Sequence, residues 1–141
     1  MSVELSQLMQ LVVGQRKFLT VGSLPIEARR YFGCNPGLVY LRDKEARHIF
    51  NGHSDVSPQD ALFIGLAVET GRYYEDPKRP NCTSVVYRNR ETGRPYLLGL
   101  KIVDPHEVWV STFHHTNDQK IRQRYKARLV ICPERQAGTL G

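Results

Sequence analysis

The second half of the chain carries three β-prone segments joined by short turns, and this pattern constrains the fold more than any other feature. Residues 83–90 and 96–103 flank the turn-forming segment Glu91-Thr-Gly-Arg-Pro95, and residues 106–113 follow the Asp104-Pro105 turn. Two β-prone runs around a glycine-containing turn are typical of a hairpin, which a third run extends into a meander. We therefore predict a mainly antiparallel sheet here.

The first half is predicted to be richer in helix. Pro25 in a first turn and Gly33 at the end delimit one short helix, and Asp43 provides the N-cap of another. The predicted fold class is α+β, with N-terminal helices packed on the antiparallel β-meander sheet. Helices are predicted over 3–13, 24–32, 43–52, 58–70 and 117–126, and further short strands over 17–21, 38–41 and 128–131.

A length of 141 residues predicts one compact unit. Within it we distinguish an N-terminal helical extension (1–37), an α+β domain (38–132) and a tail (133–141). The longest nearly apolar stretch, 61–68, is far shorter than the roughly 20 residues that cross a bilayer, so no membrane partner is expected. The three cysteines form no Cys-x-x-Cys pair, which favours a reducing, cytoplasmic compartment.

The chain carries an excess of positive charge that is concentrated late in the sequence. Its formal net charge is +6. Residues 120–128 hold five cations and no acid, and Arg88, Arg90 and Arg94 form a second cluster. Such clusters are typical of proteins that bind nucleic acid or another polyanion. A solvated helix face beside an arginine-rich hairpin tip has the same composition, so both interpretations stand at this point.

Several enzyme classes lack their motifs in this sequence. His48 and His53 are five residues apart, whereas a helical zinc site places two His four residues apart around a general-base Glu. His114 and His115 are adjacent on a predicted strand and point to opposite faces. There is no Gly-x-Ser-x-Gly nucleophile motif and no phosphate-binding glycine loop. We expect neither a metal nor another cofactor.

Metal-independent RNA cleavage requires only the residue types that remain. A base removes the proton of the ribose 2′-hydroxyl, a cation stabilises the charge on the phosphorane, and an acid protonates the departing 5′-oxygen. Imidazole titrates near neutrality and suits both proton-transfer roles, and the chain has five His. Arg and Lys provide the phosphate contacts and the electrostatic stabilisation.

Four features together resemble the phage-associated barnase–EndoU–colicin–RelE-like nuclease domains. They are the run Leu38-Val-Tyr-Leu-Arg-Asp-Lys-Glu-Ala-Arg-His48-Ile-Phe-Asn-Gly-His53, the helix at 61–70, the hairpin, and the segment Val108-Trp-Val-Ser-Thr112-Phe-His. Those domains show a strand, a helix with a His-Ile-x-x-x-His pattern, a second helix, and a hairpin followed by a strand that ends in Val-x-Thr-aromatic. The resemblance covers about residues 38–126. It implies a toxin or phage-linked effector with a frequent acidic inhibitor, or antitoxin, as its protein partner.

The resemblance also implies roles for individual residues. His48, His53 and Thr112 match the catalytic positions, and the strand residues Arg88 and Lys101 match phosphate-contacting ones. A different interpretation of the two histidines stays open. His48 can interact with the carbonyls at its helix C-terminus, and His53 can follow the helix exit without a reactive role.

The strand at 106–113 leaves a second choice open. Strict alternation places Val108, Val110 and Thr112 on one face and Trp109, Ser111, Phe113 and His115 on the other. If the valine face is the core, Ser111 and His115 replace Thr112 as site candidates. Tyrosines near the cations can stack on unpaired bases or belong to the edge of the core, and these are Tyr73, Tyr74, Tyr87, Tyr96 and Tyr125.

The favoured hypothesis is a metal-independent endoribonuclease that cleaves cellular RNA. The alternatives are a non-catalytic RNA-binding module and a protein-interaction domain that binds an acidic partner. A nuclease requires imidazoles and cations around one cleft, whereas a binding module requires only a basic and aromatic surface. In each case the basic helix contributes Lys120, Arg122 and Arg124.

Charge reversal at Lys120, Arg122 and Arg124 is expected to weaken binding of RNA or of an acidic inhibitor. Each phosphate contact that forms on binding releases counterions. A variant that makes fewer contacts releases fewer counterions, so its log K depends less steeply on log salt. Titrations of labelled RNA at several salt concentrations measure this slope. An unchanged slope would reduce the helix to a solvated face.

Overall fold

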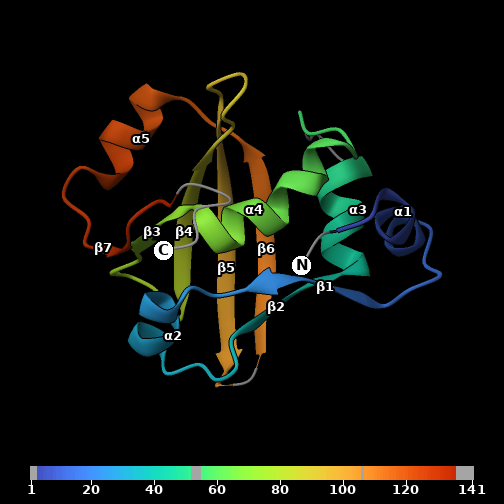
Figure 1. Ribbon diagram of the computed structural model, residues 1–141, viewed down its shortest axis with the longest axis horizontal. Coiled ribbons are helices and arrows are strands. Elements are labelled where there is room, and N and C mark those ends of the chain that lie inside the picture. The colour runs from blue at the N-terminus through green and yellow to red at the C-terminus, as the bar shows by residue number, and fades with distance from the viewer. Residues whose placement is uncertain (1–2, 52–54, 106, 136–141) are drawn as a thin grey trace.

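The computed structural model describes residues 3–51, 55–105 and 107–135, and in this part of the chain helices lie against a seven-stranded sheet (Figure 1). The helices are α1 (Leu5–Val12), α2 (Ile26–Phe32), α3 (Asp43–Asn51), α4 (Phe63–Thr70) and α5 (Asp118–Tyr125), with a 3-10 turn at Asp60–Leu62. The strands are β1 (Phe18–Ser23), β2 (Leu38–Arg42), β3 (Arg72–Glu75), β4 (Cys82–Arg88), β5 (Pro95–Asp104), β6 (Glu107–His115) and β7 (Val130–Cys132).

The strand order in the sheet is β1-β2-β6-β5-β4-β3-β7. Strands β3 to β6 form an antiparallel meander in which Val85 pairs with Leu98 and Leu98 pairs with Phe113. The β1–β2 hairpin joins this meander through a parallel pair that places Val39 beside Val108. The predicted α+β class, with N-terminal helices on a mainly antiparallel sheet, is confirmed.

One face of the sheet is apolar and is covered by the N-terminal helices. Leu98 and Leu100 of β5 and Phe113 of β6 are at most 2% exposed on this side. Helix α4 crosses the centre of the face, where Ile64 and Val68 are buried, and α3 and α1 lie beside it (Figure 1). We call this side the helix-covered face.

The opposite side of the sheet is covered by α5 over part of its width. Ile121 and Tyr125 lie one helical turn apart and pack against Tyr74 of β3 and Leu97 of β5. The Tyr74 and Tyr125 rings stack with their centroids 4.6 Å apart. No described helix packs over the same side of β6, β2 and β1. We call this second side the open face.

Strand β3 is the element that the sequence prediction missed. It has four residues and no pattern of its own, with Tyr73 and Tyr74 turned to opposite faces. Its strand character comes from partners distant in sequence, because it pairs with β4 on one side and with β7 on the other.

In the described part of the chain, no helix combines the length and the apolar character needed to span a membrane.

Gly71 allows α4 to turn directly into β3. The Cβ of an alanine at this position would overlap Val85 Cγ1 and would lie 2.6 Å from the carbonyl oxygen of Ala67. Because one of these neighbours is backbone, a side-chain rotation cannot relieve the contact. Gly71→Ala is therefore expected to lower the free energy of unfolding by about 1–3 kcal/mol or more, measured by urea denaturation.

Gly93 provides the control for this substitution. It has a positive φ of 72° but nothing within 4 Å of an added Cβ. Gly93→Ala therefore carries only the conformational penalty of about 1–2 kcal/mol for a left-handed residue. If Gly71→Ala had a free energy of unfolding equal to or higher than that of Gly93→Ala, the contacts of an added Cβ with Val85 and Ala67 would not be destabilising.

Candidate functional site

A β-bulge in β6 determines which side chains reach the open face. Gly99 pairs with Thr112, but Leu100 pairs with Val110, so Ser111 is an extra residue on β6. Val108, Val110 and Phe113 are all buried in the helix-covered face, although two residues, and not one, separate Val110 from Phe113. The strict alternation that grouped Phe113 with Ser111 is therefore wrong. Bulges of this kind re-aim side chains and are frequent beside active sites.

The bulge brings the hydroxyls of Ser111 and Thr112 together above Gly99. An added Cβ on Gly99 would lie 2.6 Å from Thr112 Oγ1 and 2.8 Å from Ser111 Oγ. Both hydroxyls therefore occupy the space that a larger residue on β5 would fill. The two candidates that the sequence treated as alternatives lie side by side, and both residues are exposed.

His114 contributes an imidazole to the same place. Its Nδ1 lies 2.9 Å from the carbonyl oxygen of His115. A carbonyl only accepts hydrogen bonds, so in the neutral ring Nδ1 carries the proton and Nε2 has the free lone pair. The ring is therefore oriented with a basic nitrogen available to a ligand.

These groups line one hollow of about 480 Å³ between α5 and the open face of the sheet. Two of its cations have partners: Arg79 pairs with Asp76, and Arg128 donates to the Glu75 carbonyl and lies over the Tyr125 ring. Arg124 of α5 forms no ion pair with any described carboxylate. The polar lining consists of Ser84, Ser111, Thr112, His114, Asp76, Arg79, Arg124 and Arg128, together with Cys82, Thr83 and Tyr125.

Asp76, at the edge of the hollow, is a carboxylate that stays ionised and binds the turn that follows it. Burial opposes ionisation of Asp76, but hydrogen bonds from the backbone N–H groups of Arg79 and Lys78 and from the Arg79 guanidinium outweigh it and lower the pKa of the carboxyl. Asp76 is therefore an anion that holds the turn at 76–79. Among the residues that line the hollow, His114 carries the imidazole.

The structure separates the predicted catalytic residues into different places. Ser111 and Thr112 lie in the hollow. His48 is exposed on α3, which packs on the helix-covered face, so it does not approach them. His53 lies outside the described residues. His115 points into the helix-covered face, where its ring centroid lies 4.5 Å from that of Tyr96.

His115 belongs to a separate polar cluster around Asp60. The Tyr96 hydroxyl donates to Asp60 Oδ1 at 2.7 Å, the Ser57 N–H donates to Oδ2 at 2.8 Å, and His115 Nε2 lies 3.8 Å from Oδ2. His115 Nδ1 is buried and has no hydrogen-bond partner in the described part of the chain. The cluster ties the start of α4 to the ends of β5 and β6.

The predicted substrate-binding residues are also distributed over several surfaces. Tyr87 is buried beside Phe63 and Tyr96, and Arg88 pairs with Asp118 at the start of α5. Tyr87 therefore belongs to the core, and the Arg88 guanidinium already has a carboxylate partner. Lys101 is exposed on the open face, and Arg124 lines the hollow, whereas Lys120 is exposed on α5 outside it.

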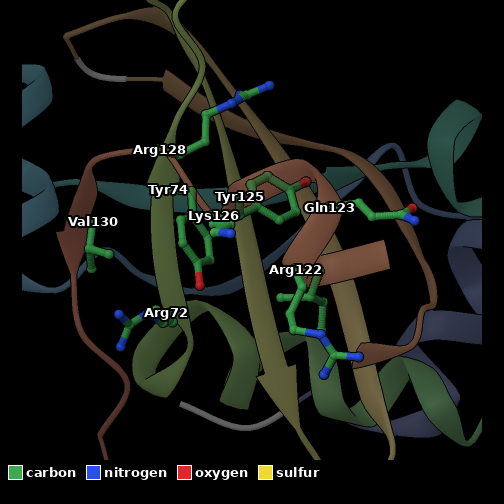
Figure 2. A pocket seen from close by; sticks show the side chains of 9 residues that line it. Arg72, Tyr74, Arg122, Gln123, Tyr125, Lys126, Arg128 and Val130 are labelled. Carbon is green, nitrogen blue, oxygen red and sulfur yellow. The ribbon is translucent and has the colours of Figure 1, made fainter. Parts of the chain in front are cut away.

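Arg122 lies at a second hollow of about 630 Å³ on the other flank of α5, which we call the outer hollow (Figure 2). Its floor is the stacked pair Tyr74 and Tyr125, with the Arg72 guanidinium 5.7 Å from the centre of the Tyr74 ring. The lining is otherwise Ile121, Arg122, Gln123, Lys126, Arg128 and Val130. It contains no imidazole, hydroxyl of Ser or Thr, or carboxylate, so this surface is suited to binding and not to proton transfer.

His114, Ser84, Gly99, Arg79 and Arg128 are the site residues that the sequence reasoning missed. One signal was available for the bulge. The apolar residues Val108 and Val110 are two positions apart, as strand alternation requires, but the next buried apolar residue on that face, Phe113, follows three positions later. That break in the alternation indicates an inserted residue in β6, which moves both Thr112 and His114 from the valine face to the open face beside Ser111. The residues from β4 and the 76–79 turn had no such signal.

Among the described residues, no group of three or more His, Cys, Asp or Glu side chains is placed to hold a metal ion. Comparison with known proteins finds no family model, no curated protein and no solved structure that matches this chain. The interpretation of the hollow therefore depends on its own residues and their geometry.

The Asp60 cluster makes stability depend on pH. Burial opposes ionisation of Asp60, but hydrogen bonds from Tyr96 and Ser57 and the nearby His115 lower the pKa of Asp60 below its ordinary value of 3.8. A carboxyl with a lowered pKa stabilises the folded state above that ordinary value and loses this contribution as the pH falls through the folded pKa. The stability advantage of the wild type over Asp60→Asn is expected to shrink between pH 5 and pH 2.

Chemical denaturation at each pH measures this difference. Asp55, which is exposed, provides the control, because the difference between the wild type and Asp55→Asn should change little over the same range. An advantage over Asp60→Asn that stayed constant from pH 5 to pH 2 would contradict the proposed role of the cluster.

Proposed function

We propose that this protein is a metal-independent ribonuclease whose active site is the hollow on the open face. The observation that carries the proposal is the bulge in β6, which gathers the Ser111 and Thr112 hydroxyls with the His114 imidazole beside Arg124. A base, hydroxyl donors and unpaired positive charge around one concavity fit a phosphodiester that is cleaved by its own 2′-hydroxyl.

The reaction assigns one role to each group. His114 Nε2 removes the proton of the 2′-hydroxyl, and the 2′-oxygen attacks the adjacent phosphorus. The bond between phosphorus and the 5′-oxygen breaks, and the 5′-oxygen takes up a proton from water. The hydroxide that this leaves takes the proton from the His114 imidazolium, which regenerates the neutral base. The products are a 2′,3′-cyclic phosphate and a 5′-hydroxyl, with no change in redox state.

In this mechanism the arginines and the hydroxyls stabilise the negative charge of the phosphate. The Arg124 guanidinium, free of an intramolecular carboxylate partner among the described residues, can pair with a non-bridging phosphate oxygen. Ser111 and Thr112 donate hydrogen bonds to the same phosphate. Arg79 and Arg128 raise the positive potential at the rim and attract the RNA backbone.

An acidic inhibitor protein remains the protein partner that we propose. The outer hollow supports it, because Arg72, Arg122 and Lys126 surround an apolar floor there. We also propose a cytoplasmic location. The three cysteines, Cys34, Cys82 and Cys132, are free thiols, which fits a reducing compartment.

Purified protein is expected to cleave single-stranded RNA in excess EDTA and to leave cyclic phosphate ends. His114→Ala should lower the cleavage rate about 10²–10⁴-fold, because it removes the general base. His48→Ala is the matched control, since it removes an exposed imidazole on the helix-covered side, and it should retain the wild-type rate. Gel assays on a labelled oligonucleotide, with melting temperatures of both variants, measure these effects.

Three outcomes would contradict the proposal. Cleavage that required a divalent metal would exclude this mechanism. Loss of activity in His48→Ala with full activity in His114→Ala would move the site to the helix-covered side, as the resemblance implies. RNA binding without cleavage by the wild type would instead support the RNA-binding module.

A further inference from the structure

A row of aromatic side chains crosses the part of the open face that α5 leaves uncovered. Phe18 of β1 lies edge-to-face with Tyr40 of β2, with ring centroids 5.6 Å apart. Tyr40 in turn lies 5.3 Å from the Trp109 ring on β6. We call these three residues the aromatic row. They come from three adjacent strands, so they form a continuous surface.

The register places the aromatic row on the same face as the hollow. Leu41, Val39 and Val108 are fully buried in the helix-covered face, so their neighbours Tyr40 and Trp109 point the other way. Trp109 precedes Ser111 by two residues on β6, which sets the row roughly 7 Å from the bulge along the strand. A chain that lies in the hollow can therefore continue over the row.

The aromatic row is accessible and has cations beside it. Phe18 is 51% exposed, and Tyr40 and Trp109 are half-buried. The Arg42 guanidinium lies 4.8 Å from the centre of the Trp109 ring and also pairs with Glu45. Lys101 lies opposite Trp109 on β5, is exposed, and forms no ion pair with a described carboxylate.

We propose that the aromatic row is a base-stacking platform for a single-stranded segment of RNA that flanks the phosphate held in the hollow. The identity of the nucleic acid as RNA rests on the proposed function. Aromatic rings and an arginine plane on an open sheet bind unpaired bases through their faces, which are hidden in a duplex. Lys101 lies between the row and the hollow, where a connecting phosphate would lie.

Trp109 makes the proposal directly measurable, because it is the only tryptophan in the chain. The probe is a short 2′-O-methylated RNA, which cannot be cleaved by attack of its 2′-oxygen. The single strand is expected to quench Trp109 fluorescence, and a duplex of the same sequence is expected to leave it unchanged. Fluorescence anisotropy of a labelled oligonucleotide reports total binding independently.

Phe18→Ala tests the far end of the aromatic row, two strands away from the hollow. It should raise the Kd for the single strand about five-fold or more, because a base loses its stacking partner. The salt dependence of binding should stay the same, since no phosphate contact is lost. Phe18→Tyr, which keeps the ring, should restore wild-type affinity. Tyr31→Ala, which removes another exposed aromatic residue, on α2, is the matched control and should bind as the wild type does.

The outcomes separate this proposal from the ribonuclease proposal. Cleavage of unmodified RNA, together with oligonucleotide binding that leaves Trp109 fluorescence unchanged, would overturn the platform and leave the ribonuclease intact. Quenching that depends on Phe18, without cleavage, would support the platform and overturn the ribonuclease. Equal quenching by the duplex, or wild-type affinity in Phe18→Ala, would also overturn the platform.

Discussion

The pairing of β5 with β6 is the interaction on which both faces of this protein depend. Leu98 and Leu100 must meet Phe113 and Val110 on the helix-covered face, because those side chains fill the core under α4. The three residues from Leu98 to Leu100 lie opposite four residues of β6, from Val110 to Phe113, so one residue of β6 is unpaired. The bulge at Ser111 absorbs the difference, and it keeps the apolar residues in phase on one side while two hydroxyls turn to the other.

The asymmetric position of α5 divides the open face into two regions with different properties. Ile121 and Tyr125 contact β3 and β5, and Arg88 pairs with Asp118 at the first turn of the helix. The helix therefore stands over one half of the sheet and forms one wall of the hollow. The other half keeps its aromatic side chains accessible. A concavity with cations therefore lies beside an accessible row of aromatic side chains.

Part of this site could be predicted from the chain. Ser111 was a candidate from strand alternation and Arg124 from the basic cluster, whereas Thr112 and Lys101 came from the resemblance. The structure places all four on the open face or on the helix above it. His114 was passed over in favour of His115, because strict alternation assigned each to the wrong side. A single inserted residue reverses the facing of every later position in a strand, so the error began at Thr112, directly after the bulge, and extended to the strand end.

The sequence by itself determined the α+β class, strands β4, β5 and β6 of the meander, most helix limits and the basic character of the last third. These features depend on local periodicity, turn residues and composition, which act between neighbours in the chain. Tertiary structure alone decided which imidazole lies with the hydroxyls, that Tyr87 is buried while Arg88 pairs with Asp118, and that β3 is a strand. Those outcomes depend on strand register and on which helix covers which face. Both are set by contacts between segments far apart in sequence, where no local pattern carries the information.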